Sequence, residues 1–67
     1  MFERLKRVRT EARVTCDEMA TLLGLQTRGG YYKKENGDVP FTLEEAQKVA
    51  RKFNMTVEEI FFENEVS

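Results

Sequence analysis

The chain has 67 residues, a formal net charge of −1 and a pI near 5.4, which suits one domain and leaves no room for a second within that length. A fold of this size buries only about 60% of the surface that its unfolded chain exposes, so a homodimer that covers apolar residues would add stability. Cys16 is the single cysteine and there is no histidine, which excludes an internal disulfide and a thiolate metal cluster within one chain.

The opening residues, MFERLKRVR, carry cations with no apolar stretch behind them, and nowhere do 18 apolar residues follow one another. Neither export nor membrane insertion is supported by this pattern. We therefore expect a cytoplasmic protein without a membrane partner.

The two halves of the chain differ in charge. Residues 1–34 hold eight Lys and Arg against four Asp and Glu, a net of +4, whereas residues 35–67 hold three against eight, a net of −5. One half can thus face phosphate groups while the other faces away. Charge alone leaves open the alternative that both halves are simply solvated helix faces.

The first predicted helix runs from about Phe2 to Ala12, because Leu5, Val8 and Ala12 fall on one stripe at the helical period. A capping box of Thr15 and Glu18 then announces a second helix from Cys16 to Leu23. This second helix is expected to end in a sharp turn at Gly24.

Thr27 is a suitable N-cap for a third helix that runs to about Glu35. Asn36 and Gly37 are typical of a helix that ends on a left-handed residue. Pro40 prevents the helix from continuing through the loop that follows.

Capping boxes of Thr42 with Glu45 and of Thr56 with Glu59 predict a fourth helix, Leu43 to Phe53, and a fifth, Val57 to about Phe62. No strand pattern occurs, so the predicted class is all-α. The predicted core residues are Leu5, Val8, Met19, Ala20, Leu23, Leu25, Tyr31, Val39, Leu43, Ala46, Val49, Phe53, Val57 and Ile60.

The order and spacing of four segments resemble the Cro/CI-type (XRE) helix-turn-helix family: EMATLLG, YYKKENG, FTLEEAQKVARKF and MTVEEIFF. The resemblance spans nearly the whole chain. It implies that residues 1–67 form one compact five-helix, lambda-repressor-like DNA-binding domain with its helix-turn-helix at about residues 16–36. It also implies a transcriptional regulator, of phage or mobile-element repressor type, that binds a pseudo-palindromic operator in double-stranded DNA as a homodimer.

Three departures from the family pattern bear on DNA binding. Cys16 stands where the family usually has a phosphate-contacting Gln, so the Thr15 hydroxyl and the backbone N–H groups beside it are the expected phosphate contacts. The segment from Gly24 to Glu35 is one residue longer than usual, which predicts an enlarged turn. Asp38 occupies a loop where many relatives carry cations, which weakens phosphate binding.

One face of the third helix is predicted to enter the major groove, with Tyr31 on the opposite, core-facing side. Arg28 is the first candidate for a base contact, because a guanidinium can bind guanine O6 and N7 together. Lys33 could contact a base or a phosphate, Tyr32 a phosphate or a thymine methyl, and Lys34 the phosphate backbone. The full set of predicted DNA-binding residues is Thr15, Cys16, Thr27, Arg28, Gly29, Tyr32, Lys33, Lys34 and Asn36.

Gly29 and Gly30 are poor helix formers in the first turn of this helix. Their missing side chains either let the helix approach base edges closely or merely ease the enlarged turn, and the sequence does not separate these interpretations. The family resemblance further implies a structural ion pair between Arg9 and Glu35.

A short helix that contains Ile60, Phe61 and Phe62 in succession cannot bury all three on one side. Phe61, Phe62 and Val66 are therefore the predicted dimer contacts. The alternative is a single exposed Phe, which needs no special explanation.

No catalytic arrangement is visible, because the chain lacks histidine and the pairs Glu44-Glu45 and Glu58-Glu59 are accounted for by helix first turns. We expect no enzyme activity, no cofactor, no metal and no small-molecule ligand. The competing hypothesis is a protein-interaction module of the same fold that has lost DNA binding, such as an anti-repressor, antitoxin or adaptor, which the acidic pI favours.

Overall fold

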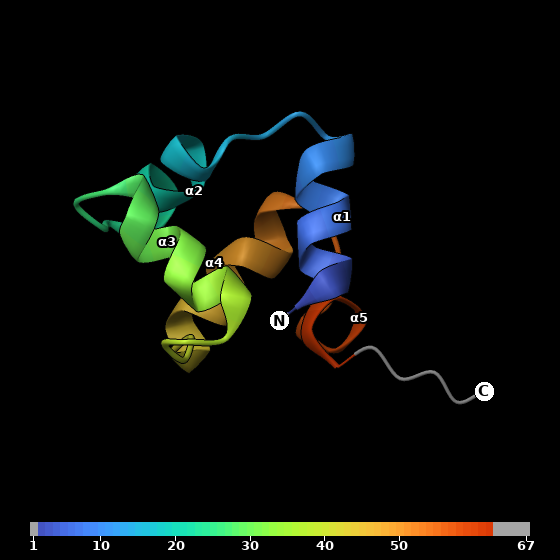
Figure 1. Cartoon of the computed structure of the whole chain (residues 1–67). Coiled ribbons are helices and arrows are strands. Elements are labelled where there is room, and N and C mark those ends of the chain that lie inside the picture. Colours follow the sequence, from blue (N-terminus) through green and yellow to red (C-terminus); the bar gives the residue numbers. More distant parts are fainter. Residues whose placement is uncertain (1, 63–67) are drawn as a thin grey trace.

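The computed structural model describes residues 2–62, and these residues form five α-helices with no strand among them. The helices are α1 (Glu3–Glu11), α2 (Cys16–Leu23), α3 (Arg28–Asn36), α4 (Leu43–Lys52) and α5 (Val57–Phe61). Figure 1 shows α2 and α3 together at one side of the molecule, α1 and α5 at the other, and α4 between and behind them. The prediction of an all-α, five-helix domain with a helix-turn-helix is confirmed for this part of the chain.

Local sequence determines where the helices begin. In each of the three predicted capping boxes, the Thr hydroxyl accepts a hydrogen bond from the N3 backbone N–H, and the N3 Glu side chain accepts one from the Thr N–H. Thr27 caps α3 in a simpler way, since its hydroxyl accepts the N–H of Gly30 at 3.1 Å. Each such cap stabilises its helix by about 1 kcal/mol. The N-termini of four of the five helices are therefore determined by local capping residues.

Two glycines end helices in the left-handed conformation. Gly24 follows α2 with φ 74°, and Gly37 follows α3 with φ 91°. A side chain is disfavoured at such angles, which explains glycine at both positions. Arg13 and Asn54 also have positive φ, 61° and 57°, and redirect the chain after α1 and after α4.

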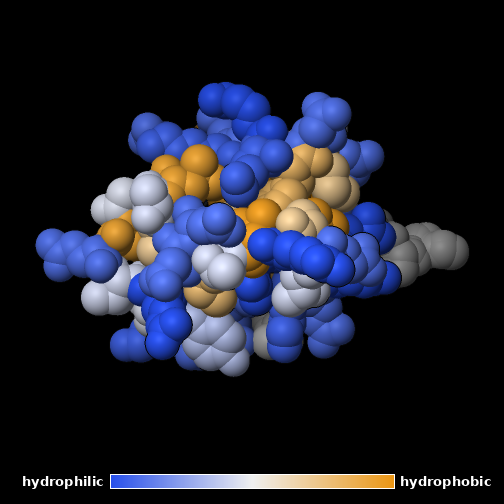
Figure 2. Space-filling model, turned by 90° about the horizontal axis from the view of Figure 1, so that it is seen from above, coloured by the Kyte–Doolittle hydropathy of each residue, from blue (hydrophilic) through white to orange (hydrophobic). Residues whose placement is uncertain are grey.

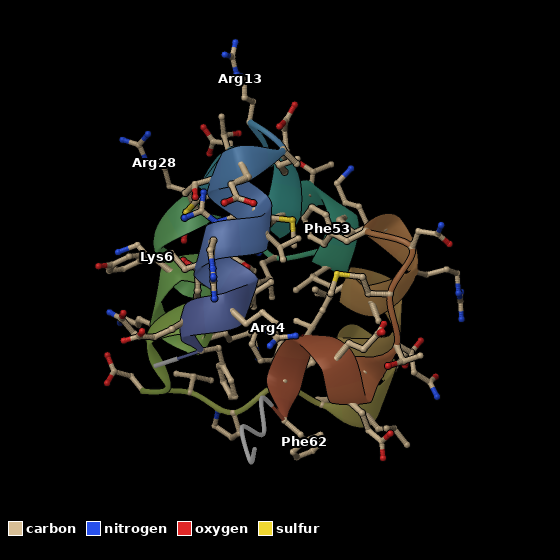
Figure 3. All side chains as sticks on the ribbon, turned by 90° about the vertical axis from the view of Figure 1, so that its right-hand side faces the viewer. Arg4, Lys6, Arg13, Arg28, Phe53 and Phe62 are labelled. Carbon is tan, nitrogen blue, oxygen red and sulfur yellow. The ribbon has the colours of Figure 1, made fainter. Side chains whose placement is uncertain are left out.

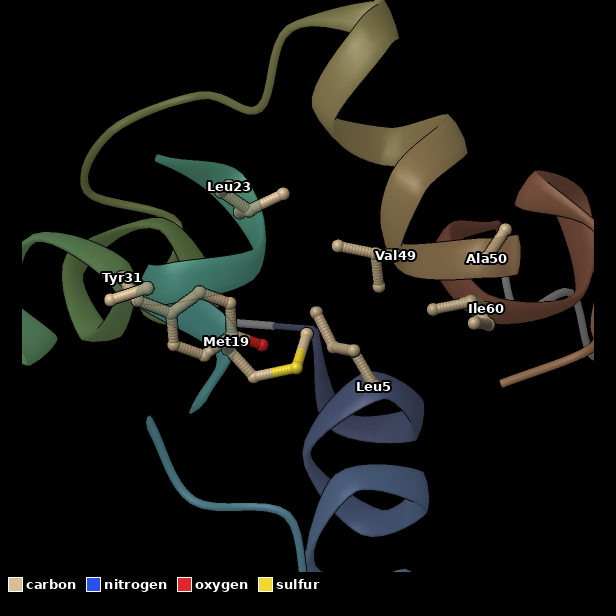
Figure 4. Close-up of a cluster of buried hydrophobic side chains, with 8 residues drawn as sticks. Leu5, Met19, Leu23, Tyr31, Val49, Ala50 and Ile60 are labelled. Atoms are coloured by element: carbon tan, nitrogen blue, oxygen red, sulfur yellow. The ribbon is translucent and has the colours of Figure 1, made fainter. Parts of the chain in front are cut away.

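The core draws apolar side chains from all five helices (Figure 4). Six of the predicted core residues, Leu5, Met19, Tyr31, Val49, Ile60 and Ala20, are at most 4% exposed. Because this one cluster joins every helix, the positions of α2 and α3 depend on α1, α4 and α5 as well. The buried apolar residues are Leu5, Met19, Ala20, Leu23, Tyr31, Ala46, Val49, Ala50 and Ile60.

Two predicted core residues lie at the surface. Leu43 is 71% exposed and Val39 is 38% exposed. Leu43 is the first residue of α4, and the core-facing side of that helix is formed by Ala46, Val49 and Ala50 instead. The helical period thus predicts the buried stripe on α4 correctly, except that it includes one residue too many, Leu43, at the N-terminus of the helix.

Phe41, in the loop before α4, packs against the core, whereas Leu43 does not. Its ring lies 4.9 Å from that of Phe61, 5.7 Å from that of Phe2 and 6.3 Å from that of Tyr31, all in edge-to-face geometry. Phe2 and Phe61 are also in contact, at 5.3 Å. Such pairs contribute about 0.5–1.5 kcal/mol each beyond the area they bury, and this aromatic cluster joins the start of α1, the loop before α4, and α5.

No helix among residues 2–62 has the length and apolar character needed to cross a membrane.

Candidate nucleic-acid interface

The turn between α2 and α3 comprises residues 24–27 and is held by backbone hydrogen bonds. Gly24 donates to the carbonyl of Thr21 at 3.2 Å, and Leu25 donates to that of Ala20 at 2.8 Å. The chain then passes to Thr27, the N-cap of α3, and α3 packs against α2. The result is a pair of helices of eight and nine residues with the second one at the surface.

Helix α3 has two distinct sides. Tyr31, Lys34 and Glu35 are buried, whereas Arg28, Gly29, Tyr32 and Lys33 are exposed. Asn36, at the end of the helix, is half-buried. The structure therefore brings four of the predicted groove-facing residues together on an open surface.

A shallow hollow of about 730 Å³ lies beside the start of α3, between the end of α1 and the start of α2. It contains three arginines, Arg9, Arg13 and Arg28, and one carboxylate, Asp17. Figure 3 shows the side chains of Arg13 and Arg28 extending away from the body of the molecule at the same end. The lining residues are Arg9, Thr10, Arg13, Val14, Thr15, Cys16, Asp17, Arg28, Gly29 and Tyr32.

Arg13 was not predicted as a site residue. It follows α1 with a left-handed backbone, φ 61°, and its side chain lines the hollow. Figure 2 shows the same end of the molecule from above, where hydrophilic side chains predominate and small apolar areas lie between them.

Thr15 and Cys16, for which the sequence predicts phosphate contacts, both line the hollow. The Thr15 hydroxyl accepts the N–H of Glu18 at 3.1 Å and retains its own proton for donation. Cys16 is half-buried. Asp17 is exposed in the same turn, so any anion bound there has a carboxylate nearby.

A buried polar network fixes the inner side of α3. Arg9 donates from Nε to Glu35 Oε2 at 2.8 Å and from Nη2 to Oε1 at 3.1 Å, so the ion pair implied by the family resemblance is present. The Tyr31 hydroxyl donates to Glu35 Oε2 at 3.0 Å. Arg9 also donates from Nη1 to the carbonyl of Val14 at 3.0 Å, which connects α1, α3 and the loop before α2.

The pKa values of Arg9 and Tyr31 are both raised in this network. The hydrogen bond from Arg9 to Glu35 raises the pKa of Arg9 above its ordinary value, although burial opposes this change. Burial, followed by the charge of Glu35, raises the pKa of the Tyr31 hydroxyl. Arg9 therefore stays charged, and Tyr31 stays a neutral hydrogen-bond donor.

The prediction that Lys34 contacts phosphate is wrong. Its side chain is 11% exposed, and its ammonium lies 3.0 Å from Glu45 Oε1 and donates to the carbonyl of Pro40 at 3.0 Å. The ammonium also lies 6.0 Å from the centre of the Phe41 ring. Lys34 therefore holds the loop between α3 and α4 against the start of α4, and its position on the inner side of α3 keeps it away from solvent.

Glu45 has two functions at the start of α4. It accepts the N–H of Thr42 in the capping box and also pairs with Lys34. Burial raises the pKa of Glu45, but the hydrogen bond from the Thr42 backbone and the interaction with Lys34 outweigh it, so the pKa lies below its ordinary value of 4.5. The carboxylate is thus ionised at neutral pH.

The two glycines of the first turn have helical backbones. Positive φ occurs at Gly24 and Gly37 but not at Gly29 or Gly30. A glycine in a helix costs up to about 1 kcal/mol relative to alanine. The conformation of the turn therefore does not require glycine at either position.

The predicted dimer contacts separate into different environments. Phe62 is 65% exposed. Phe61 is half-buried in the aromatic cluster with Phe2 and Phe41, so part of its ring packs within the chain, and its role as a dimer contact stays a prediction. Val66 lies outside the described residues.

Five short helices, a left-handed glycine between α2 and α3, and an exposed face on α3 define an all-α domain of the helix-turn-helix type. Residues 1–66 match the family model of the BetR domain, and the chain belongs to this family. No curated protein and no solved structure matches the chain.

Proposed function

We propose that this chain is a sequence-specific double-stranded DNA-binding transcriptional regulator, and that α3 is its recognition helix. The observation that carries the proposal is the exposure of Arg28, Tyr32 and Lys33 on one side of α3, while Tyr31 and Glu35 are held inside. A helix with a cationic outer face and a fixed inner face can enter the major groove without rearranging the domain. We also propose that the chain is a member of the Cro/CI-type (XRE) family, which its sequence resembles.

The exposed residues suggest a division of roles. Arg28 is at the first position of α3, where a guanidinium can bind guanine O6 and N7. Tyr32 and Lys33 lie further along the helix, within reach of bases or phosphates. Arg13, Thr15 and the start of α2 line the adjoining hollow, where a phosphate of the DNA backbone would be held.

Repression would follow from occlusion. Two copies related by a two-fold axis would present their α3 helices to successive major grooves, about 34 Å apart, on a pseudo-palindromic operator. Phe62 is the exposed apolar residue proposed for the contact between the copies. A regulator of this kind acts in the cytoplasm and needs no cofactor and no catalytic residues.

A titration with a random-sequence duplex tests the proposal. The wild-type chain and the Arg28→Ala and Lys33→Ala variants are titrated at about 50 and 200 mM salt, since contacts to phosphates make affinity fall steeply with salt. Lys52→Ala is the matched control, because it removes one exposed cation from the end of α4, which belongs neither to α3 nor to the lining of the hollow.

We expect salt-sensitive binding that is weakened by both α3 variants and unchanged in the control. Complete absence of binding by the wild-type chain at both salt concentrations would contradict the proposal and favour the protein-interaction module. Equal weakening by all three variants would contradict the assignment of α3 as the recognition helix.

A further inference from the structure

The first turn of α3 contains two glycines that the free domain does not need. A Cβ added at Gly29 would meet only the Thr27 hydroxyl oxygen, at 3.9 Å, and one at Gly30 would meet the same atom at 3.5 Å. Both separations are ordinary van der Waals contacts. Alanine therefore fits at each position, in contrast to Gly24, whose φ of 74° disfavours any side chain.

The two positions differ in what surrounds them. Gly29 is exposed and lines the hollow together with Arg28 and Tyr32. Gly30 is half-buried, does not line the hollow, and donates its N–H to Thr27. The absence of a side chain at Gly29 thus leaves bare helix backbone between two of the residues proposed to contact DNA.

We propose that Gly29 is the point at which the α3 backbone most closely approaches the floor of the major groove, where a base-pair edge occupies the space of the missing side chain. The proposal rests on the proposed DNA-binding function. It explains why a poor helix former stands at a position where the fold accepts a better one. The methyl group of alanine would hold the helix away from the bases and lengthen the contacts of its neighbours.

Gly29→Ala and Gly30→Ala in the full chain form a matched pair for the test. Each is expected to raise the midpoint of thermal unfolding by a few degrees, because alanine favours the helix at both positions. Titration with a duplex that the wild-type chain binds should then show about tenfold or greater weakening for Gly29→Ala, as expected for overpacking of a close contact. Gly30→Ala should bind like the wild type.

Several results would overturn the proposal. Binding by Gly29→Ala within about threefold of the wild type would show that no close approach occurs there. A fall in its unfolding midpoint would make Gly29 a structural residue instead. Failure of the wild-type chain itself to bind duplex DNA would remove the proposed function as well, whereas loss confined to Gly30→Ala would overturn this inference alone.

Discussion

Arg9 on α1 holds Glu35 in the last turn of α3 through two hydrogen bonds, of 2.8 and 3.1 Å. Glu35 is fully buried and Arg9 is 8% exposed. Because Tyr31 donates to the same carboxylate, the inner side of α3 is fixed at two positions one helical turn apart. The outward orientation of Arg28 and Lys33 follows from this attachment.

Removing one member of the pair should destabilise the domain strongly. Arg9→Met leaves Glu35 as an uncompensated buried charge, and we expect a loss of about 3–5 kcal/mol in the free energy of unfolding. Urea unfolding followed by circular dichroism measures this loss.

A combined replacement provides the control. Arg9→Met, Tyr31→Phe and Glu35→Leu together substitute apolar groups for the whole network, which should restore most of the lost stability, since no buried charge or hydroxyl remains unpaired. A triple variant as unstable as Arg9→Met alone would show that the cost lies in packing and not in the unpaired charge.

Lys33 and Lys34 are adjacent in sequence, yet their alanine variants should differ in effect. Lys33 is exposed, so Lys33→Ala should reduce the slope of log affinity against log salt by about 1, with little change in stability. Lys34→Ala should lower the unfolding midpoint and leave that slope unchanged, because its ammonium is bound to Glu45 and to the Pro40 carbonyl. A reduced salt slope in Lys34→Ala would return Lys34 to the DNA interface.

The ion pair between Lys34 and Glu45 makes a pH-dependent contribution to stability. The pKa of Glu45 is lowered in the folded state, so the contribution is complete above its ordinary pKa of 4.5 and is lost as the pH falls through the folded-state value. Glu45→Gln keeps a side-chain oxygen for the capping box and removes the charge. We expect it to reduce stability by about 1 kcal/mol at pH 7 and to match the wild type in strong acid.

Unfolding midpoints measured at several pH values between 7 and 2 provide the comparison. Glu59→Gln in the capping box of α5 is the control for the exchange of Glu for Gln, because it leaves the ion pair between Lys34 and Glu45 intact. A Glu45→Gln effect that is independent of pH would contradict this account of the pair.

Phe61 and Phe62 should also respond differently to substitution. Phe62→Ser removes an exposed ring, so it should weaken self-association and leave the unfolding midpoint nearly unchanged. Phe61→Ala should lower stability by about 3 kcal/mol or less, since its half-buried ring contacts Phe2 and Phe41. Sedimentation equilibrium with and without duplex DNA measures the association, and a Phe62→Ser variant that dimerises like the wild type would exclude this contact.

The parts of the fold that depend on neighbouring residues were predictable from the sequence. Thr15, Thr42 and Thr56 each form a capping box with the Glu three positions later, and such contacts depend on only one helical turn. The helical period likewise predicts which side chains of α2 point into the core of the domain. Helix starts were therefore predicted well.

The environment of Lys34 and the exposure of Leu43 depend on tertiary structure. Whether Lys34 meets solvent or Glu45 is decided by the path of the loop between α3 and α4, which no local pattern specifies. Phe41, one residue before the capping Thr42, packs against the core with a partly buried ring, whereas Leu43, which the helical period assigned to the core, is exposed. Arg13 also lines the hollow, in the turn after α1 where its backbone is left-handed, and no local pattern marked it as a site residue.

Selection of bound sequences from a random duplex pool tests the central claim most directly, because it reports specificity and symmetry together. The account predicts enrichment of an inverted repeat whose half-sites are centred about 10 base pairs apart, and loss of preference at one position of each half-site for Arg28→Ala. A pool that stays unenriched, or a preference that survives Arg28→Ala at every position, would contradict the assignment of α3 as the element that reads DNA.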